Sequence, residues 1–359
     1  AVRAVIDKGN LSTLNAPEEV YLAERLVELH PWADMARFAR SGGEACAIAV
    51  RIARAASGRD GIAFCGYHGW HDWYLSSNLV DKNNLNKHLI PGLDPVGVHK
   101  KLIKTSFAFN YNDITQLQKI ISKNEIGIVK MEVCRSSRPN LSFLRKVRSL
   151  CSKKNIILIF DECSSGFREN LGGLHQKYKI EPDLAIFGKA LGNGYAITAV
   201  LGKKEIMDSA DKSFISSTFW TERIGPTAGI KVLEIMEREK TWNKITFLGE
   251  RLIKIWKKLS FRHNLKIDIF GIPSLAKFSF ISRDALKYKS YITQEMLKKN
   301  ILASNGVYMS SSHNIKILKK YEENLDKIFY DISECEKGNL LIDSLLKYPA
   351  SRVPFGRVN

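Results

Sequence analysis

The chain has 359 residues, enough for two domains, and its 45% hydrophobic content is that of an ordinary globular protein with a buried core. No apolar run approaches the roughly 20 residues that span a bilayer, and the N-terminus lacks the apolar segment of a signal peptide. The formal net charge of +18 invites a nucleic-acid partner. Because the lysines are scattered and no nucleic-acid-binding motif is present, we expect a basic surface or attraction to an anionic substrate instead.

The six cysteines form no CxxC motif and show no close pairing with histidines. Most of them lie within or beside apolar segments, which is typical of reduced core thiols. We therefore expect a cytosolic protein with neither a disulfide framework nor a metal site. The positions are Cys46, Cys65, Cys134, Cys151, Cys163 and Cys335.

The N-terminal region predicts two helices and a short strand. Residues 1–10 are amphipathic and end at a Gly-Asn pair, and residues 17–30 place Val20, Leu22, Leu26 and Leu29 at a spacing near 3.6. A short strand is then expected from residue 35 to 40.

A strong helix follows, from Ser41 to about Ser57, and Gly58 is its stop signal. Its opening, Ser41-Gly42-Gly43, places two glycines between a strand and a helix N-terminus. Free backbone amides and the positive end of the helix dipole form a phosphate cradle there, with no side chain in the way. The alternative is an ordinary capped helix, which the local pattern taken alone favours.

Two further strands end next to polar or aromatic residues. Residues 61–65 precede Gly-Tyr67-His68-Gly-Trp-His, where aromatic rings suit stacking on a flat ligand, although a packed aromatic loop explains them equally well. Residues 126–131 form a buried strand that ends at Glu132. Arg135 and Arg138 come next, before a helix, and either face a substrate carboxylate or sugar hydroxyl or lie on the surface.

The segment NIILIF, residues 155–160, predicts another buried strand that leads directly into Asp161-Glu162. An acid at the carboxyl end of such a strand belongs either to a ligand site or to the cap of the turn that follows. The sequence CSSGFR after the two acids is compatible with the second reading.

The stretch PDLAIFGKALGNG, residues 182–194, is the one around which the chain is organised. A buried strand over residues 184–187 stops at a glycine, Lys189 follows, and the chain turns. Ligands of α/β proteins bind beyond the carboxyl ends of such strands, where burial in a dry cleft makes a lysine amine nucleophilic. The alternative is that Lys189 is one surface lysine among many.

The 28 positions from Asp161 to Lys189 suffice for one crossover and a return strand, so both residues are expected at the same edge of one sheet. A carboxylate beside a lysine is what pyridoxal phosphate (PLP) requires. The lysine forms the Schiff base, and the carboxylate keeps the pyridine nitrogen protonated.

The C-terminal part predicts a basic helix over residues 242–259, two short strands within residues 267–281 and a late helix over residues 317–334. We expect a large cofactor-binding domain over residues 1–245 and a small domain over residues 246–359.

Several stretches, in the correct order, resemble the class III PLP-dependent aminotransferases, and among them the glutamate-1-semialdehyde aminomutase subgroup. They are FARSGGEACAIAVRIARAASGRDGIAFCGYHGWHD, FNYNDITQL, LIFDECSSGFR, PDLAIFGKALGNGYAITAVLG, SSTFWTERIGPTA and GVYMSSSHN. The resemblance covers nearly the whole chain. It implies the type I aminotransferase fold: a large domain with a mostly parallel seven-stranded sheet and a smaller α/β domain.

The resemblance also assigns roles. Lys189 forms the Schiff base and moves the proton, Asp161 holds the pyridine nitrogen, Tyr67 stacks on the ring, and Cys163 lies along the opposite face. Thr218 reaches the phosphate in the neighbouring subunit, which implies a homodimer with shared sites. The implied cofactor-binding residues are Ser41, Gly42, Gly43, Tyr67, His68, Glu132, Asp161, Cys163, Lys189 and Thr218.

The chain departs from the family at three places. It begins with Ala after the family's usual N-terminal segment, so we expect a fragment, a split-gene product or a decayed copy. Val133 replaces the usual proline. Phe219-Trp220-Thr221-Glu222-Arg223 stands where the aminomutase has a glycine-rich stretch. We therefore expect a cytosolic transaminase that acts on an amino-acid donor and another carbonyl acceptor. The wording of the motifs resembles members associated with surface-polysaccharide biosynthesis.

Two alternatives remain at this point. One is an aminomutase, an isomerase in which a single substrate gives and receives the amino group. The other is a catalytically silent basic interaction protein that keeps the fold, whose affinity for polyanions would depend on salt.

Overall fold

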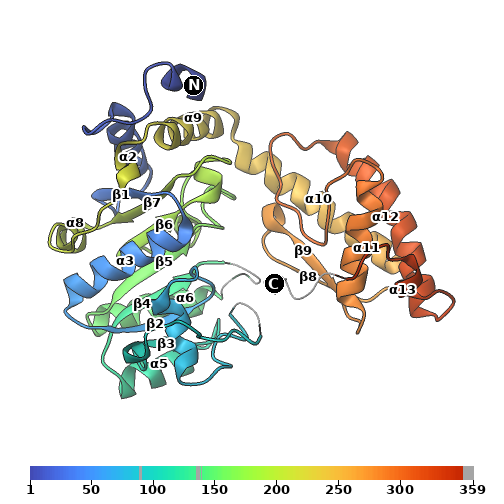
Figure 1. Ribbon diagram of the computed structural model, residues 1–359, viewed down its shortest axis with the longest axis horizontal. Coiled ribbons are helices and arrows are strands. Elements are labelled where there is room, and N and C mark those ends of the chain that lie inside the picture. The colour runs from blue at the N-terminus through green and yellow to red at the C-terminus, as the bar shows by residue number, and fades with distance from the viewer. Residues whose placement is uncertain (89–90, 135–137, 139, 351–359) are drawn as a thin grey trace. The chain divides into compact units, whose positions relative to one another are not determined.

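The computed structural model describes residues 1–88, 91–134, 138 and 140–350, and the chain divides into two compact units, Ala1–Lys240 and Thr241–Asn359 (Figure 1). The division falls at Lys240, whose left-handed backbone separates helix α9 (Ile224–Glu239) from α10 (Thr241–Arg262). The sequence-based boundary between residues 245 and 246 lies inside α10. Within the described ranges, no helix combines the length and apolar character needed to cross a bilayer.

The first unit contains a seven-stranded sheet of order β1-β7-β6-β5-β4-β2-β3. Only β7 runs antiparallel to its neighbours, β1 and β6, so the predicted mostly parallel sheet is confirmed. The strands are β1 (Met35–Ala39), β2 (Gly61–Cys65), β3 (Ser106–Ala108), β4 (Ile126–Glu132), β5 (Ile157–Glu162), β6 (Leu184–Phe187) and β7 (Thr198–Gly202).

Helix α3 (Gly42–Ser57) packs on this sheet through a face of small residues. Ala45, Ala49 and Ala53 are fully buried in one apolar cluster with Ile159 and Ile186 of the strands. Small side chains let the helix lie close to the sheet, which fixes where its N-terminus stands. The other helices of this unit besides α9 are α1 (Val2–Ile6), α2 (Pro17–Leu29), α4 (Asp72–Leu75), α5 (Ile114–Lys123), α6 (Leu141–Lys153), α7 (His175–Tyr178) and α8 (Lys204–Met207).

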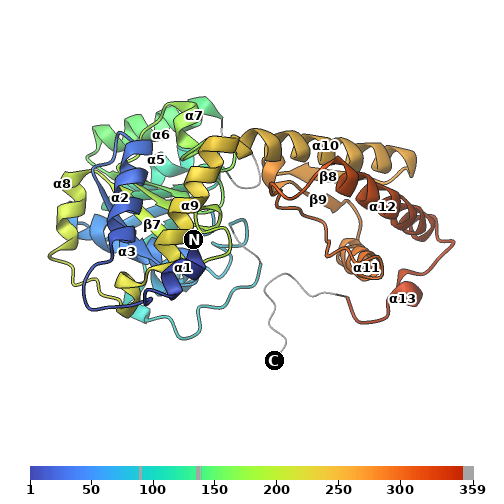
Figure 2. The same cartoon turned by 90° about the horizontal axis from the view of Figure 1, so that it is seen from above.

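Helices α2 and α9 lie side by side, which Figures 1 and 2 both show. Ion pairs join Glu18 to Arg223 at 2.7 Å and Arg25 to Glu237 at 2.6 Å, one toward each end of the pair. The contact therefore anchors the N-terminal part of the chain to a helix far away in sequence.

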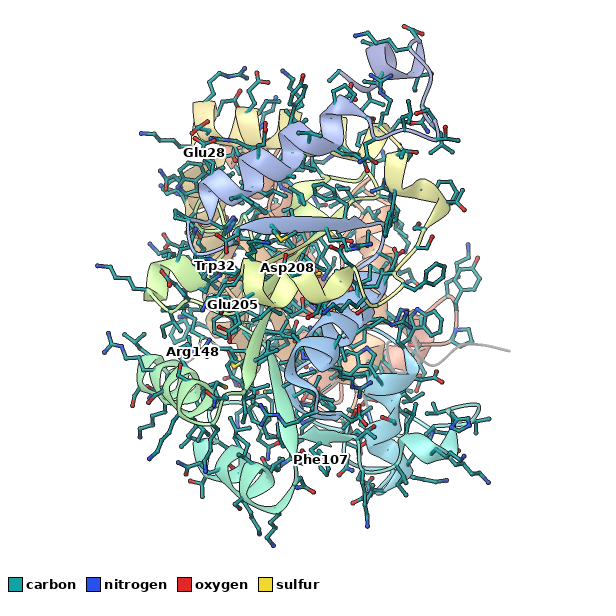
Figure 3. All side chains as sticks on the ribbon, turned by 90° about the vertical axis from the view of Figure 1, so that its left-hand side faces the viewer. Glu28, Trp32, Phe107, Arg148, Glu205 and Asp208 are labelled. Carbon is teal, nitrogen blue, oxygen red and sulfur yellow. The ribbon has the colours of Figure 1, made fainter. Side chains whose placement is uncertain are left out.

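Asp183 lies just before β6, near the amino ends of the parallel strands β5 and β6. Its carboxylate accepts a hydrogen bond from the Leu158 amide at 2.8 Å and pairs with Arg148 of α6 and with Lys203, each at 2.9 Å (Figure 3, where Arg148 is labelled). Backbone and side-chain donors thus satisfy this acid internally.

Most expected elements lie within a few residues of the observed ones. The strand expected over residues 155–160 is β5, which starts two residues later and includes Asp161 and Glu162. The helix expected over residues 1–10 was too long, because α1 ends at Ile6.

The second unit packs helices around a two-stranded antiparallel sheet. Trp256, Phe278 and Phe329 are fully buried in its core, and the Trp256 indole donates a hydrogen bond to the Tyr321 hydroxyl at 3.0 Å. Besides α10, its elements are β8 (Ile267–Phe270), β9 (Lys277–Phe280), α11 (Ala285–Leu297), α12 (Ile315–Glu336) and α13 (Ile342–Leu345).

Glu162, at the end of β5, organises the turn after the strand. Its fully buried carboxylate accepts hydrogen bonds from the amides of Leu174 and His175 at 2.8 Å each, and from the Ser165 hydroxyl at 2.7 Å. The His175 Nδ1 lies 2.7 Å away, and its Nε2 accepts from the Trp32 indole at 2.9 Å, so Nδ1 carries the proton. Although burial opposes ionisation, these donors hold the pKa of Glu162 below its usual value.

The first prediction concerns Gly249 in α10. An alanine in a helix is normally about 1 kcal/mol more favourable than glycine. Here a Cβ would stand 2.0 Å from the carbonyl oxygen of Pro273, in the short helix η6 (Pro273–Leu275). We expect Gly249→Ala to lower the free energy of unfolding of the second unit by about 2–3 kcal/mol, as overpacking does. Denaturant titration measures this change. Glu250→Ala, at the exposed next position, is the control, and a stabilised Gly249→Ala chain would contradict the close approach.

The second prediction concerns pH and Glu162. A carboxyl group whose pKa is depressed by folding adds stability above its unfolded pKa, near 4.5, and loses it as the pH falls through the folded value. We expect Glu162→Gln to cost about 2–3 kcal/mol at pH 7, because several donors lose a charged acceptor. The difference from wild type should shrink below pH 4.5. Denaturant titrations at several pH values measure it, with the exposed Glu181→Gln as control. A difference independent of pH would argue against the ionised form.

Candidate active site

The carboxyl ends of the parallel strands bring the predicted residues to one edge of the sheet. Asp161, near the end of β5, stands in register with Glu132 of β4 on one side and Ile186 of β6 on the other. Lys189 follows β6 two residues after its end. The expectation that Asp161 and Lys189 come from strands of the same sheet, at the same edge, agrees with this register, and the two strands are adjacent.

Lys189 leaves the sheet through an unusual backbone. Gly188 is extended, and Lys189 has a φ of +44°, a region that residues with a Cβ rarely adopt. Its ammonium group donates a hydrogen bond to the Ser164 hydroxyl in the turn after β5. The side chain is exposed, so the expectation of a lysine in a dry cleft was wrong for the single chain. Because the Lys189 side chain is exposed beside this turn, its amine is accessible.

Asp161 is buried and surrounded by donors. Its Oδ1 accepts a hydrogen bond from the Cys163 amide at 3.1 Å. Three groups converge on Oδ2: His68 Nδ1 at 2.8 Å, Lys130 Nζ at 3.0 Å and Cys46 Sγ at 3.1 Å. Burial alone would raise the pKa of Asp161, but Lys130 and His68 outweigh it and hold that pKa well below its usual value. The carboxylate is therefore ionised.

The start of α3 has the backbone features expected of a phosphate cradle. Ser41 caps the helix in a capping box, in which its hydroxyl accepts from the Glu44 amide while the Glu44 carboxylate accepts from the Ser41 amide. Within the described residues, no hydrogen bond occupies the amides of Gly42 and Gly43. The capped helix and the phosphate cradle, which the sequence left as alternatives, are thus compatible.

Glycine is required here because the chain comes close to itself. Gly69 has a φ of +94°, and a Cβ on it would stand 2.7 Å from the Cα of Gly43. A Cβ on Gly43 would stand 3.0 Å from the ring of His71. The Nδ1 of His71 is buried without a hydrogen-bond partner in the described chain. A polar group thus faces the cradle from the side of the β2 loop.

Cys163 lies at the centre of the site. Its Sγ stands 3.4 Å from the position of a Cβ on Gly42 and 3.5 Å from one on Gly188. It therefore bridges the start of α3 and the residue before Lys189. Its expected position along the face of a ligand ring stays a prediction.

Tyr67 and Glu132 belong to one arrangement. The Tyr67 amide donates to Glu132 Oε2 at 3.0 Å, so the carboxylate holds the loop after β2. The Tyr67 ring is half-buried and meets Tyr74 edge to face, with centroids 5.9 Å apart. His68 is buried, and its Nδ1 lies 2.8 Å from Asp161 Oδ2.

The segment with Thr218 is packed on β1 and its continuation. Thr218 is exposed at the start of the short helix η5 (Thr218–Thr221). Arg40 donates to the Phe219 carbonyl and approaches Glu222 to 3.4 Å. The Arg37 guanidinium lies 4.2 Å from the ring centroid of Trp220. The bulky residues that replace the glycine-rich stretch are therefore held close to the cradle by two arginines.

Of the two arginines considered for a substrate, Arg135 lies outside the described residues. Arg138 forms an ion pair with Glu169, whose carboxylate also binds Lys177 at 2.7 Å. Arg138 is therefore paired with an acid of this chain.

Sequence reasoning missed Lys130, Ser164 and His71. A signal existed for Lys130, because a lysine inside the apolar run IGIVKME cannot be buried without a partner. The aromatic loop after residues 61–65 included His71 without giving it a role, and no local pattern marked Ser164; the roles of both depend on contacts between distant segments.

Cys46, His68 and Asp161 each offer one ligand atom within 4.8 Å of the others, a spacing that suits a metal ion. The Lys130 ammonium, however, already neutralises the same carboxylate oxygen. Burial and the adjacent carboxylate also raise the pKa of the Cys46 thiol, so it stays neutral. Among the described residues, this trio is better explained as the lysine's pocket than as a metal site.

The residues fit a phosphorylated pyridine aldehyde. Gly42 and Gly43 supply two unoccupied amides at the start of a 16-residue helix, which suits a phosphate. Asp161 supplies a buried carboxylate, and Lys189 an accessible amine. These three features stand at one edge of the sheet and come from separate parts of the chain.

Comparisons with known proteins find relatives named as aminotransferases and aminomutases. The 3-aminobutyryl-CoA aminotransferase of Cloacimonas acidaminovorans (strain Evry) is 32% identical over 322 residues, which cover 87% of this chain and 73% of that protein. The glutamate-1-semialdehyde 2,1-aminomutase of Methanococcus maripaludis (strain C6) is 29% identical over 351 residues, which cover 91% and 81% of the two chains.

Among solved structures, the PLP form of the FumI protein of Sphingopyxis sp. MTA144 superposes with a TM-score of 0.84 at 23% identity, and covers 96% of this chain and 82% of that one. This likeness shows the fold. The family model described as Aminotransferase class-III matches residues 1–323, and the chain therefore belongs to the class III aminotransferases.

Proposed function

We propose that this protein uses PLP to move an amino group from an amino-acid donor to a carbonyl acceptor. The observation that carries the proposal is the placement of Lys189 and Asp161 after adjacent parallel strands, at the edge where the free amides of Gly42 and Gly43 also lie. Family membership and the fold support it.

Bound PLP would supply an electron sink that stabilises a carbanion at the donor's α carbon. The chain's own residues bind and orient it. Gly42 and Gly43 would donate to the phosphate, Asp161 would hold the pyridine nitrogen, and Tyr67 would stack on the ring. Lys189 would hold the cofactor covalently, and its amine would accept the proton from the donor's α carbon and return it.

A homodimer and a cytosolic location complete the proposal. Thr218 is exposed, as a residue that reaches the phosphate in a partner subunit must be in the single chain. The cysteines are all free thiols, which suits a reducing compartment.

The segment Thr218–Arg223 bears on the reaction type. Arg37 and Arg40 hold Phe219, Trp220 and Glu222 near the cradle, where bulky residues narrow the space for a substrate. This packing favours a transaminase over the aminomutase. The aminomutase remains the second candidate, because relatives named glutamate-1-semialdehyde 2,1-aminomutase are 29–31% identical over most of the chain.

The third prediction concerns Lys189. Added PLP should give the wild-type chain a visible absorption band, and borohydride should fix the cofactor on the peptide that contains Lys189. Lys189→Ala and the charge-conserving Lys189→Arg should lose the covalent attachment and at least about 100-fold in transamination, because the base and the attachment point are gone. Lys212→Ala, another exposed lysine of the same unit, is the control. Full turnover by either Lys189 variant would sink the assignment, as would salt-dependent polyanion binding by a chain that takes up no PLP.

The fourth prediction separates transaminase from aminomutase. An amino-acid donor offered without an acceptor should bleach the visible band of the transaminase and release one keto acid per site, because the amino group stays on the enzyme. Adding a carbonyl acceptor should restore the band. A chain that instead isomerises glutamate 1-semialdehyde in repeated turnovers, with no second donor, is an aminomutase. Absorbance and product analysis over a donor panel distinguish the two.

A further inference from the structure

Lys130 is a buried charge that the proposed chemistry does not use. It lies in the middle of β4, its side chain is fully buried, and its neighbours in the strand are apolar. Its ammonium group lies 3.0 Å from Asp161 Oδ2 and 3.1 Å from His68 Nδ1. A lysine is buried in this way only when an anion compensates for its lost hydration, and Asp161 is that anion.

The hydrogen bonds of His68 decide where the positive charge resides. Its Nδ1 lies 2.8 Å from Asp161 Oδ2, and at that distance one of the two atoms must carry the proton between them. Asp161 is ionised, so Nδ1 carries the proton and donates it to the carboxylate. Burial lowers the pKa of His68 to about 4, so the ring bears no net charge near pH 7.

Lysine binds its proton far more tightly than histidine does. The Lys130 ammonium also lies within hydrogen-bond distance of Asp161 Oδ2. Lys130 is therefore the cation of the cluster, and His68 donates beside it to the same carboxylate oxygen.

We propose that Lys130 is a resident counter-ion of Asp161: it keeps the carboxylate ionised and oriented in the empty site, and it then shares that carboxylate with the pyridine nitrogen of the cofactor. The proposal rests on the proposed use of PLP. Lys130 is thus a positioning residue, because it acts through Asp161 and touches neither substrate nor the reacting carbon.

Sharing the Asp161 carboxylate between Lys130 and the pyridine nitrogen has an electrostatic consequence. An aspartate alone holds a proton on the pyridine nitrogen by its full negative charge. An ammonium group on the same carboxylate offsets much of that charge in a buried setting, where screening is weak. The ring nitrogen should therefore bind its proton less tightly than it would beside an unshared Asp161, and the ring should withdraw electrons less strongly.

The fifth prediction uses Lys130→Met, which keeps length and apolar volume but removes the charge. The control is Met131→Leu, at the next position of the same strand, which points to the other face of the sheet. The apo form of Lys130→Met leaves Asp161 without its cation and should melt roughly 5–15 °C below wild type. PLP supplies a replacement cation, so it should raise the melting temperature of Lys130→Met by several degrees more than that of wild type.

A second readout is independent of both activity and folding stability. PLP labelled with ¹⁵N in its ring reports the protonation of that nitrogen by NMR in each holo protein. The midpoint of this titration should lie about one pH unit or more higher in Lys130→Met than in wild type or Met131→Leu, because Asp161 is no longer shared. An unchanged midpoint, together with equal losses of apo and holo stability, would show a merely structural lysine and overturn the proposal.

A double variant keeps the proposal testable if Lys130→Met does not fold. Lys130→Met combined with Asp161→Asn removes both charges, so it should be more stable than Lys130→Met alone. A double variant no more stable than the single one would overturn the ion pair. If wild type takes up no PLP, the proposed function fails. The apo melting temperatures of the single and double variants still judge the ion pair separately.

Discussion

The structure depends on the burial of one carboxylate at the end of a parallel strand. An ionised Asp161 in the interior would be very unfavourable without donors, and no single element supplies them. Lys130 comes from the neighbouring strand, His68 from the loop after β2, Cys46 from α3 and the Cys163 amide from the turn after β5. Satisfying this charge therefore fixes four segments relative to one another. The site is ordered by the same interactions that make its burial tolerable.

The two adjacent acids of β5 have different roles because side chains along a strand alternate between the two faces of the sheet. Asp161 points to the face covered by α3, where the cradle and Lys130 lie. Glu162 points to the other face and satisfies the amides of Leu174 and His175. That contact closes the loop which also carries Ser164, the partner of Lys189. The sequence raised two roles for this pair, a ligand site and a turn cap, and each residue takes one of them.

Strand ends and glycines were readable from the sequence because they are local. The apolar runs that lead into Asp161 and Lys189, and the Ser41-Gly42-Gly43 opening of α3, predicted the sheet edge and the cradle. The position of His68 was not readable, because only the folded chain places Cys65, Lys130 and Asp161 around its ring. Nor was the exposure of Lys189, since accessibility depends on what covers a residue rather than on its own segment. Lys130 lay between these cases: its charge was visible in the strand, but its partner was not.

The residues at the sheet edge bear on cofactor binding, whereas we expect substrate choice to depend on the loop that packs near this edge. Under the proposed function, the edge residues would contact a cofactor that is common to a family with many substrates, so they carry little information about the acceptor. Phe219 and Trp220 are different, because they belong to a loop rather than to the sheet, and Arg37 and Arg40 hold them from β1 and the residue that follows it. The strand is rigid because it lies in the sheet, and its arginines hold the position of a loop whose residue types can vary. Under the proposed function, such an arrangement would let one set of cofactor residues serve different acceptors. We therefore expect the contact between β1 and the segment Thr218–Arg223 to set the substrate specificity of this chain.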